Sequence, residues 1–406
     1  MRILYFFLII LLYNGKVFAQ NWIPMLQDTI LDNSQEIWID GGAQFNGNSL
    51  TSNFITKFFY GGNISSEIKD QNLNRMKNVN LFYSDVQANF SYRNTKGKFL
   101  KNKNIGWTVN AGASSYLTSN FNKQAFQLAF YGNAPFIGKF ADISGSRIQN
   151  FTFEKIGFGL IDKKSSSSCL VNFVNLTNYS DFHTYGGGVY QSSDVDTLQI
   201  FLNGKFSQYG GKNLSSGFGA SLDIDKRFFV FKDNGEPIFF RLEINNLGLV
   251  KAQSTRMYEV DTLIEFTGVT FNQLTGGAPL IDSTNQFLQN IGLTTKEEKS
   301  WIMLPVSLQL SKMVNTLSKS SIQEFYGVRM LYLSDIQVFA GVDYKVPLNG
   351  KIVWHIGTNI SYGGSANFMF GNYSHISWNK FYFGILSENL LSRSGESIKL
   401  KLQCAF

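Results

Sequence analysis

Cysteine and histidine are nearly absent from this sequence of 406 residues. It contains two cysteines, Cys169 and Cys404, and three histidines, His183, His355 and His375. Two cysteines cannot build a disulfide framework, and their separation along the predicted strands favours two isolated thiols. No histidine has another histidine, a cysteine or paired carboxylates at the spacing of metal ligands. We therefore predict neither a metal site nor a bound cofactor.

Motifs of catalysis and of nucleic-acid binding are also missing. The sequence has no Gly-x-Ser-x-Gly elbow, no P-loop and no dinucleotide-binding fingerprint. Gly186-Gly187-Gly188 precedes no helical pattern, so we interpret it as a turn or a flexible strand edge. The formal net charge of +7 is scattered and forms no basic stripe of the kind that nucleic-acid-binding proteins show. We predict that the protein is not an enzyme and does not bind nucleic acid.

Long apolar runs are lacking too, apart from a short one at the amino terminus. Arg2 precedes the apolar run 3–12, and Val17-Phe18-Ala19 offers the small residues of a cleavage site. Residues 1–19 are therefore predicted to be a cleavable signal peptide that directs export through the inner membrane of a Gram-negative cell. The alternative, a membrane anchor, would need about 20 apolar residues. Without another such run, a membrane protein of this sequence must span as a closed β-barrel.

The carboxyl-terminal stretch 397–406 alternates between apolar side chains and polar or small ones. Successive side chains of a strand point to opposite faces, so one face of this strand is apolar and the other is polar. A terminal aromatic residue on such a strand resembles the signal that the bacterial barrel-insertion machinery reads. We predict that this barrel-assembly signal comprises Leu400, Leu402, Cys404 and Phe406. A soluble β-protein is the alternative.

The same alternation recurs through most of the chain after residue 81. The strand-like segments are 85–93, 105–117, 150–162, 168–177, 198–207, 218–225, 238–245, 256–267, 302–310, 322–333, 335–346, 351–363, 366–374, 378–387 and 397–406. We predict an all-β fold, a transmembrane antiparallel β-barrel of about 14 strands. Aromatic residues at 15% and charged residues at 16% agree with aromatic girdles and a lipid-facing band. The polar rows place Arg93, Arg241 and Glu243 in the lumen.

One hairpin yields two further lumenal residues. Tyr344 and Trp354 both lie on apolar rows, and residues that oppose each other across a hairpin share a face of the sheet. A three-residue loop, Leu348-Asn349-Gly350, gives this register and makes Asp343 the lumenal partner of His355. The pair is interpreted either as a satisfied polar contact, which we favour, or as a pH-sensitive pair.

Two stretches have helical instead of strand periodicity. Residues 48–76 carry apolar side chains at four-residue spacing and are interrupted by Gly61-Gly62, which predicts two short amphipathic helices. In residues 268–300, Ser283 to Ile291 carry apolar side chains at helical spacing before Gly292, and Thr294-Thr295-Lys296-Glu297 has the spacing of a capping box. We therefore predict a helical insertion in this long connection. A shorter helix is expected at 124–131, before Gly132.

These periodicities divide the chain into three parts. Residues 1–19 form the signal peptide, and residues 20–80 form an amino-terminal arm with helices that either plug the lumen or cap its periplasmic face. Residues 81–406 form the barrel, with the helical insertion near 268–300.

The layout resembles the FadL-like group of outer-membrane barrels, and it looks closest to an uncharacterised branch of unknown function in Bacteroidota. The matching stretches are Tyr131-Gly132-Asn133, Asp142-Ile143-Ser144-Gly145-Ser146-Arg147, Leu242-Glu243-Ile244-Asn245-Asn246-Leu247-Gly248-Leu249-Val250 and Phe266-Thr267-Gly268. The resemblance covers most of the chain with loose motifs. It implies transport of a hydrophobic substrate, and none of the family's ligand-contacting residues can be matched here.

The sequence therefore predicts an outer-membrane protein for passive, FadL-like uptake or binding of a small molecule, which could be hydrophobic. Its expected partners are outer-membrane lipid, the barrel-insertion machinery and that small ligand. The alternative is a barrel that does not transport and serves as a scaffold or as a partner in assembly or secretion.

Overall fold

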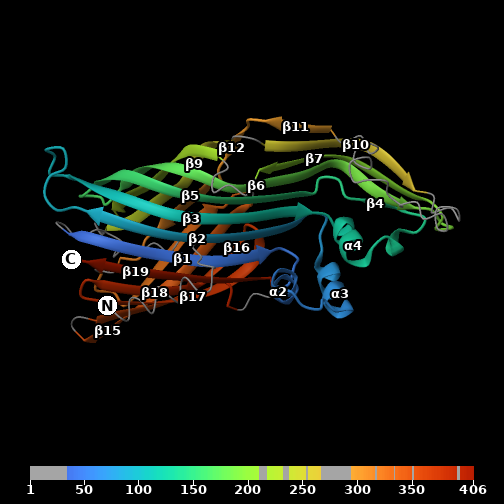
Figure 1. Ribbon diagram of the computed structural model, residues 1–406. Helices are drawn as coiled ribbons and strands as arrows, with labels where there is room; N and C mark the ends of the chain where they lie inside the picture. Colours follow the sequence, from blue (N-terminus) through green and yellow to red (C-terminus); the bar gives the residue numbers. More distant parts are fainter. Residues whose placement is uncertain are drawn as a thin grey trace.

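The computed structural model describes residues 34–209, 217–231, 237–252, 255–266, 294–315, 318–332, 334–349, 352–390 and 394–406. The strands of these residues belong to one antiparallel sheet (Figure 1). In chain order they are β1 (Gln35–Gly47), β2 (Asn80–Asn94), β3 (Ile105–Phe121), β4 (Phe140–Asp142), β5 (Arg147–Asp162), β6 (Ser168–Gln191), β7 (Leu198–Tyr209), β8 (Gly217–Phe231), β9 (Pro237–Ala252), β10 (Thr255–Phe266), β11 (Thr294–Glu298), β12 (Trp301–Met303), β13 (Ser307–Lys312), β14 (Ile322–Met330), β15 (Ile336–Asn349), β16 (Ile352–Gly363), β17 (Ala366–Trp378), β18 (Phe381–Ser387) and β19 (Gly395–Ala405).

The sheet closes into a barrel because its first and last strands pair. β1 lies between β2 and β19, with Ile39 opposite Phe90 on one side and opposite Leu402 on the other. At four positions of the ring, consecutive strands share one place in the wall. These groups are β4 and β5; β7 and β8; β9 and β10; and β11, β12 and β13. With each of these counted once, the described residues form a closed ring of 14 strands. The predicted fold class is confirmed.

The barrel begins before residue 81, so the predicted boundary between arm and barrel is wrong. The alternation of β1 is weak because its inward row contains Trp38, whereas its outward row contains the small residues Gly41 and Ala43. This strand therefore did not stand out in the sequence, although it closes the ring.

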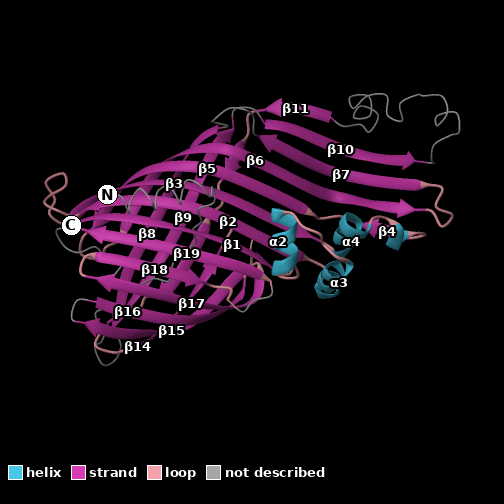
Figure 2. Cartoon of the chain, turned by 60° about the horizontal axis from the view of Figure 1, so that its bottom comes forward, coloured by secondary structure: helices cyan, strands magenta, loops and turns pink. Residues whose placement is uncertain are grey.

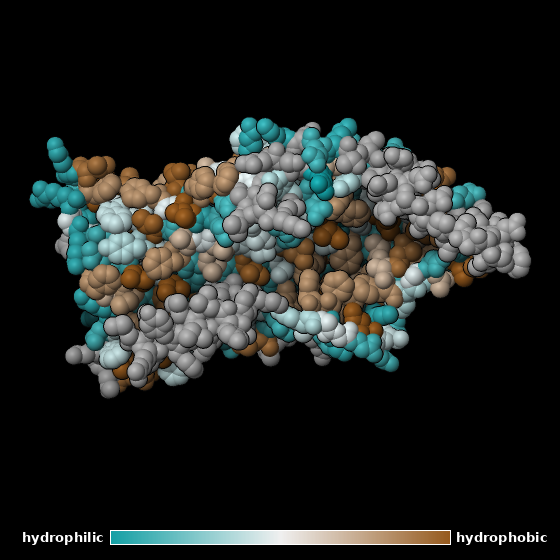
Figure 3. Space-filling model, viewed as in Figure 1, coloured by the Kyte–Doolittle hydropathy of each residue, from teal (hydrophilic) through white to brown (hydrophobic). Residues whose placement is uncertain are grey.

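Along the ring, apolar side chains point outward and polar ones point into the lumen. On β5, Phe158 is 49% exposed while Lys155 is buried, and on β19 Leu400 is 44% exposed while Lys399 is buried. Apolar side chains lie along the visible barrel wall in Figure 3. Water-soluble monomers rarely expose so much apolar surface, whereas a barrel in lipid requires it. The outward face is therefore a lipid-facing face.

The two ends of the barrel differ in the length of their connections. At the end where β19 finishes, the turns 163–167 and 379–380 are short. At the opposite end, the connections 48–79 and 122–146 are long. Barrels of the outer membrane have short periplasmic turns and longer extracellular loops. We therefore name the end with the long connections the outer end and the other the inner end.

At the outer end, one part of the wall continues beyond the rest of the ring (Figures 1 and 2). We call this part the outer extension, and it consists of β4, the later part of β6, β7, β10 and β11. The segment Tyr179–Gln191 of β6 pairs with β7, β7 pairs with β10, and β10 pairs with β11. The extension forms one side of the outer mouth of the lumen.

Three helices, α2 (Ser52–Tyr60), α3 (Ser66–Arg75) and α4 (Lys123–Tyr131), also lie at the outer end (Figure 2). The Thr51 side chain caps α2, and Gly61 and Gly132 end α2 and α4 at positive φ, which glycine adopts without strain. The helices predicted at 48–76 and 124–131 are therefore confirmed. No helix in the described part of the chain is long and apolar enough to cross a membrane.

The position predicted for the first two helices is wrong. They connect β1 to β2 at the outer end, and they pack with α4 against Phe45, Phe82 and Leu117 of the outward face. They therefore neither plug the lumen nor cap the periplasmic face. The apolar faces of the helices are buried against the apolar outward face of the barrel, which the polar lumen could not provide.

The α3–α4 contact includes a hydrogen bond of 2.6 Å from the Tyr131 hydroxyl to Asp70 Oδ1. Burial and this carboxylate raise the pKa of Tyr131 to about 12. The phenol therefore stays protonated and keeps its role as a donor at physiological pH.

Only part of the helical insertion expected near 268–300 lies in the described residues. Residues 267–293 lie outside the described residues. Residues 294–298 form strand β11 and pair with β10, so the capping-box interpretation of Thr294-Thr295-Lys296-Glu297 is wrong. The free edge of β10 offers these residues ladder hydrogen bonds that outweigh the local capping pattern.

Candidate functional site

An apolar layer crosses the lumen between its inner and outer parts. Its side chains come from β2, β3, β5, β6, β9 and β12 and from the residues that follow β12 and β14. The layer consists of Tyr83, Tyr116, Phe151, Phe153, Val174, Leu176, Tyr179, Val250, Ala252, Ile302, Leu304 and Leu331. Phe153 and Leu304 are fully buried. Because lumens of such barrels are polar, this layer is an exception that requires an explanation.

The turn after β14 reaches across the lumen and completes the layer. Leu331 belongs to the layer, and the ring of Tyr332 meets that of Phe151 edge to face at 5.5 Å. The Tyr332 hydroxyl donates a hydrogen bond of 3.2 Å to Gln149 Oε1. β14 and β5 are not neighbours in the ring, so these contacts connect opposite walls.

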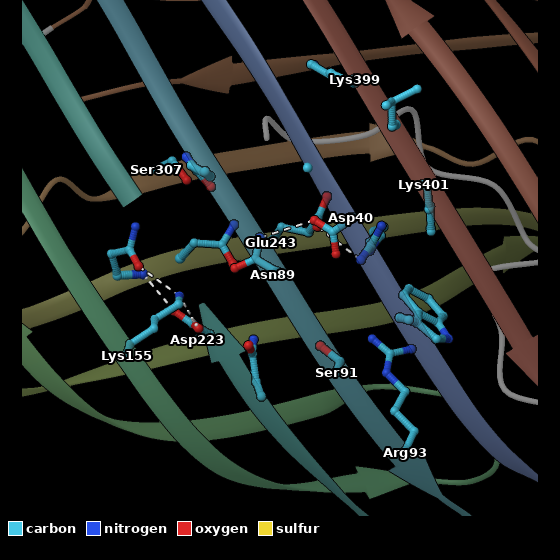
Figure 4. Close-up of a pocket in the computed structure, with 18 of the residues that line it drawn as sticks. Asp40, Asn89, Ser91, Arg93, Lys155, Asp223, Glu243, Ser307, Lys399 and Lys401 are labelled. Carbon is cyan, nitrogen blue, oxygen red and sulfur yellow. Dashed lines mark hydrogen bonds and ion pairs between the residues drawn. The ribbon is translucent and has the colours of Figure 1, made fainter. Parts of the chain in front are cut away.

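A polar cavity of about 170 Å³, which we call the inner cavity, lies on the inner side of the layer (Figure 4). It begins at Arg93 and Trp38 near the inner end and reaches Tyr116 of the apolar layer. Its charged lining residues are Asp40, Arg93, Lys155, Asp223, Arg241, Glu243, Lys399 and Lys401. The predicted lumenal residues Arg93, Arg241 and Glu243 thus lie at one cavity.

Most of the cations that line the inner cavity are held in ion pairs. Lys155 Nζ lies 2.7 Å from Asp223 Oδ2. Arg241 contacts both Asp225 and Glu243 at 3.0 Å. Breaking one member of such a buried pair leaves an uncompensated charge, so these pairs hold the lumenal wall in place.

Lys399 belongs to another ion-pair cluster, on the side of the lumen formed by β14, β18 and β19. Glu388 accepts hydrogen bonds from Arg329 Nη1 at 2.8 Å and from Lys399 Nζ at 3.1 Å. All three residues are at least nine-tenths buried. The cluster connects strands at the point where β18 ends, and the carboxylate is shared between two cations.

Asp343 and His355 also point into the lumen. Their predicted register is wrong by two residues, because Tyr344 opposes Ile356 where Trp354 was expected, and an irregularity lies between Pro347 and Asn349. The side chains nevertheless meet diagonally, with Asp343 Oδ2 2.7 Å from His355 Nδ1.

Both side chains of this pair are fully buried. Tyr373 donates a hydrogen bond of 2.6 Å to Asp343 Oδ1, and the ring of His355 stacks on that of His375 at 4.8 Å. Both interpretations of the pair, as a polar contact or as a pH-sensitive pair, stay predictions.

A second polar cavity of about 290 Å³, which we call the outer cavity, lies on the outer side of the apolar layer. It is lined by residues of β5, β6, β7 and β10 and by 300–302. Arg147 and Asp181 form a bidentate ion pair in it, at 2.9 and 2.7 Å. Tyr179 and Ile302 belong to both its lining and the apolar layer, so the layer separates the outer cavity from the inner one.

The residues of the predicted barrel-assembly signal lie on the outward face. Leu400, Cys404 and Phe406 are exposed and Leu402 is half-buried, whereas Lys401 on the same strand is buried in the lumen. Recognition of these residues by the insertion machinery stays a prediction.

Sequence analysis missed Trp38, Leu331 and Tyr332. Trp38 stands in the patch Ile37-Trp38-Ile39, in which every residue is apolar, so alternation could not assign it to the lumen. Leu331 and Tyr332 were taken as the end of a strand, and only the contact with the opposite wall distinguishes them.

No family model matches the chain, and no curated protein is similar to it in sequence. Among solved structures, the toluene transporter TbuX of Ralstonia pickettii is similar with a TM-score of 0.36 and 8% identity over 92% of this chain and 90% of that one. The toluene transporter TodX of P. putida gives 0.33 and 9% over 93% and 89%. The translocator domain of autotransporter NalP of Neisseria meningitidis gives 0.26 and 7% over 93% and 89%.

The strand pairing of the chain itself defines the barrel. The closed ring of 14 strands, its apolar outward face and its polar lumen define the protein as a β-barrel of the outer-membrane class.

Proposed function

We propose that this protein lets a small polar solute pass through the outer membrane, and that the apolar layer is the closed gate of the passage. The observation that carries the proposal is the arrangement of two polar cavities on opposite sides of one apolar layer. Hydrophobic constrictions close water-filled pores because water and ions leave them unfilled.

The turn that bears Leu331 and Tyr332 is the part of the layer best suited to move. The other members of the layer lie on strands held by ladder hydrogen bonds, except Leu304, whose backbone N–H donates a hydrogen bond of 3.1 Å to the Gly248 carbonyl. The turn, by contrast, touches the opposite wall through one ring contact and one hydrogen bond of Tyr332. Its withdrawal would join the two cavities without opening the ring.

The lining supports a polar solute better than the hydrophobic one that the family resemblance implies. Charged side chains line both cavities, and the described residues provide no continuous apolar path through the lumen. An apolar solute would have to displace water from these charges without replacing their hydrogen bonds.

A second candidate is a scaffold that does not transport. The ion pairs that connect the lumenal strands and the outer extension favour it, because both would give a rigid barrel with a large surface outside the membrane. The two candidates differ in whether removal of the gate side chains creates a conducting pore.

The test is conductance in planar bilayers. The double variant Leu331→Gly, Tyr332→Ala should raise single-channel conductance several-fold above that of the wild type, because both side chains leave the layer. Tyr362→Ala, which removes a 64% exposed outward ring, is the matched control and should leave conductance unchanged. Altered migration on unboiled gels shows that the double variant is folded. If the folded double variant conducts no better than the control, the scaffold is the better proposal.

A further inference from the structure

We propose that the inner cavity binds a small oxyanion, a carboxylate or a phosphate, through the guanidinium of Arg93. This inference rests on the proposed passage in so far as it names the class of solute. The juxtaposition that carries it is a cation stacked on an indole at the wall of a polar cavity, with its hydrogen-bonding edge uncommitted.

The guanidinium of Arg93 lies over an aromatic ring that is itself fixed. The guanidinium carbon is 3.7 Å from the centroid of the Trp38 ring, which is a cation–π contact. The indole is itself fixed, since Trp38 Nε1 donates a hydrogen bond of 3.0 Å to Glu36 Oε2, and Glu36 is fully buried. A guanidinium held by its face keeps its N–H donors at the edge, where a carboxylate or phosphate can bind with two parallel hydrogen bonds.

Arg93 differs from the other cations of the cavity in its partners. Lys155 and Arg241 hold carboxylates at 2.7 and 3.0 Å, and Lys399 holds Glu388 at 3.1 Å. For Arg93, none of the described carboxylates lies within ion-pair distance, and its short contact is the one with Trp38. Among the described residues, Arg93 therefore has donors that are available to a ligand.

A second positive charge lies beside the same ring. Lys401 Nζ is 4.2 Å from the centroid of Trp38 and approaches from β19, whereas Arg93 approaches from β2. Two cations beside one indole repel each other, and an anion in the cavity would reduce that repulsion. Rings of Arg and Lys select anions in other pores.

Asp40 should limit the binding of an anion at this site. It lines the same cavity, and its Oδ2 accepts a hydrogen bond of 3.1 Å from Asn89 Nδ2, a contact visible in Figure 4. Its negative charge should weaken the binding of an anion near Arg93. Asp40→Asn keeps the shape and a hydrogen-bonding group while removing the charge, so it should strengthen anion binding.

The experiment is calorimetric titration of the detergent-purified barrel with inorganic phosphate, with acetate and, as a cation control, with tetramethylammonium. The wild type should bind phosphate and acetate but not the cation. Arg93→Gln should weaken the binding of both anions at least about tenfold, Arg93→Lys should retain part of it, and Asp40→Asn should improve it. Lys205→Gln, which changes a cation of the outer cavity, should have no effect.

Besides a wild type that binds neither phosphate nor acetate, two results would overturn the inference. One is unchanged anion binding by Arg93→Gln in a barrel that still shows heat-dependent migration. The other is binding of tetramethylammonium in preference to either anion. Both results come from binding measurements, which do not require a solute to cross the gate. The experiment therefore distinguishes a wrong anion site from a wrong gate. If the gate variants conduct while the wild type binds no anion, the passage stands and its solute is of another class.

Discussion

Apolar side chains gather in two regions of this barrel, its outward face and one layer of its lumen, and the two regions arise differently. The outward face needs only a strand period of two, because lipid surrounds the barrel on every side. The lumenal layer combines residues of regular inward rows, such as Phe151 and Phe153 of β5, with residues that breaks in that period turn inward. An irregularity between β5 and β6 lets both Leu176 and Tyr179 face inward.

A second break lies in β9, where Asn246 has a φ of 60°. Before it, Glu243 faces the lumen, and after it Val250 does, so the parity of the inward row changes. The comparison shows that some of the apolar residues inside this barrel, such as Tyr179 and Val250, are positioned by local irregularities. Such bulges re-aim side chains at specific places, which fits a gate better than a filler of the wall.

The largest difference in the free energy of unfolding is expected between alanine variants of two phenylalanines of β5. Phe153→Ala removes a fully buried ring from the layer and should lower the free energy of unfolding by about 3–5 kcal/mol, because a cavity remains. Phe158→Ala removes a 49% exposed outward ring of β5 and should cost clearly less. Denaturant unfolding in lipid vesicles measures both. Equal losses would mean that the layer is no better packed than the lipid-facing wall.

A lysine substituted on the outward face tests whether that face contacts lipid. Leu400→Lys should cost about 2–4 kcal/mol if the site lies near the middle of the bilayer, since the charge would enter hydrocarbon. Leu400→Met keeps the site apolar and serves as the control. The amount of each variant inserted in outer membranes and its unfolding in vesicles are the readouts. Normal insertion and stability of the lysine variant would refute the lipid-facing assignment of this row.

A smaller effect is expected at the contact between the turn and the opposite wall. Tyr332→Phe removes the hydrogen bond to Gln149 and keeps the ring, so it should cost about 1 kcal/mol. If the turn is the moving part of the gate, brief openings should become more frequent in bilayer recordings. Tyr362→Phe, on the outward face, is the control. An unchanged opening frequency together with the expected loss of stability would assign Tyr332 to packing alone.

The smallest effect on stability is expected for removal of Phe406. This ring is 46% exposed at the end of the chain and buries little area. If it serves as a barrel-assembly signal, its deletion should reduce the amount of barrel in the outer membrane while the inserted fraction unfolds as the wild type does. Wild-type levels of the deletion variant would remove the assembly role from this residue.

Part of the candidate site could be read from sequence, and the rest could not. Alternation placed Arg241 and Glu243 correctly beside each other in the lumen, because they lie on one regular strand before the break at Asn246. The pairing of Asp343 with His355 was reached through a wrong register, since the irregularity near Pro347 shifts the hairpin. Diagonal neighbours still touch across a sheet, which explains the correct contact.

By itself, the sequence determined the barrel and its two faces, because strand period and side-chain polarity act locally within each strand. It also determined that the helices at 52–75 would be amphipathic, but not which surface their apolar side would cover. Only the tertiary structure decided that they pack outside the wall, that Tyr332 reaches Gln149, and that Arg93 stacks on Trp38. Each of these contacts joins residues of different strands or helices that only the assembled barrel brings together, and no local pattern records which residues will meet.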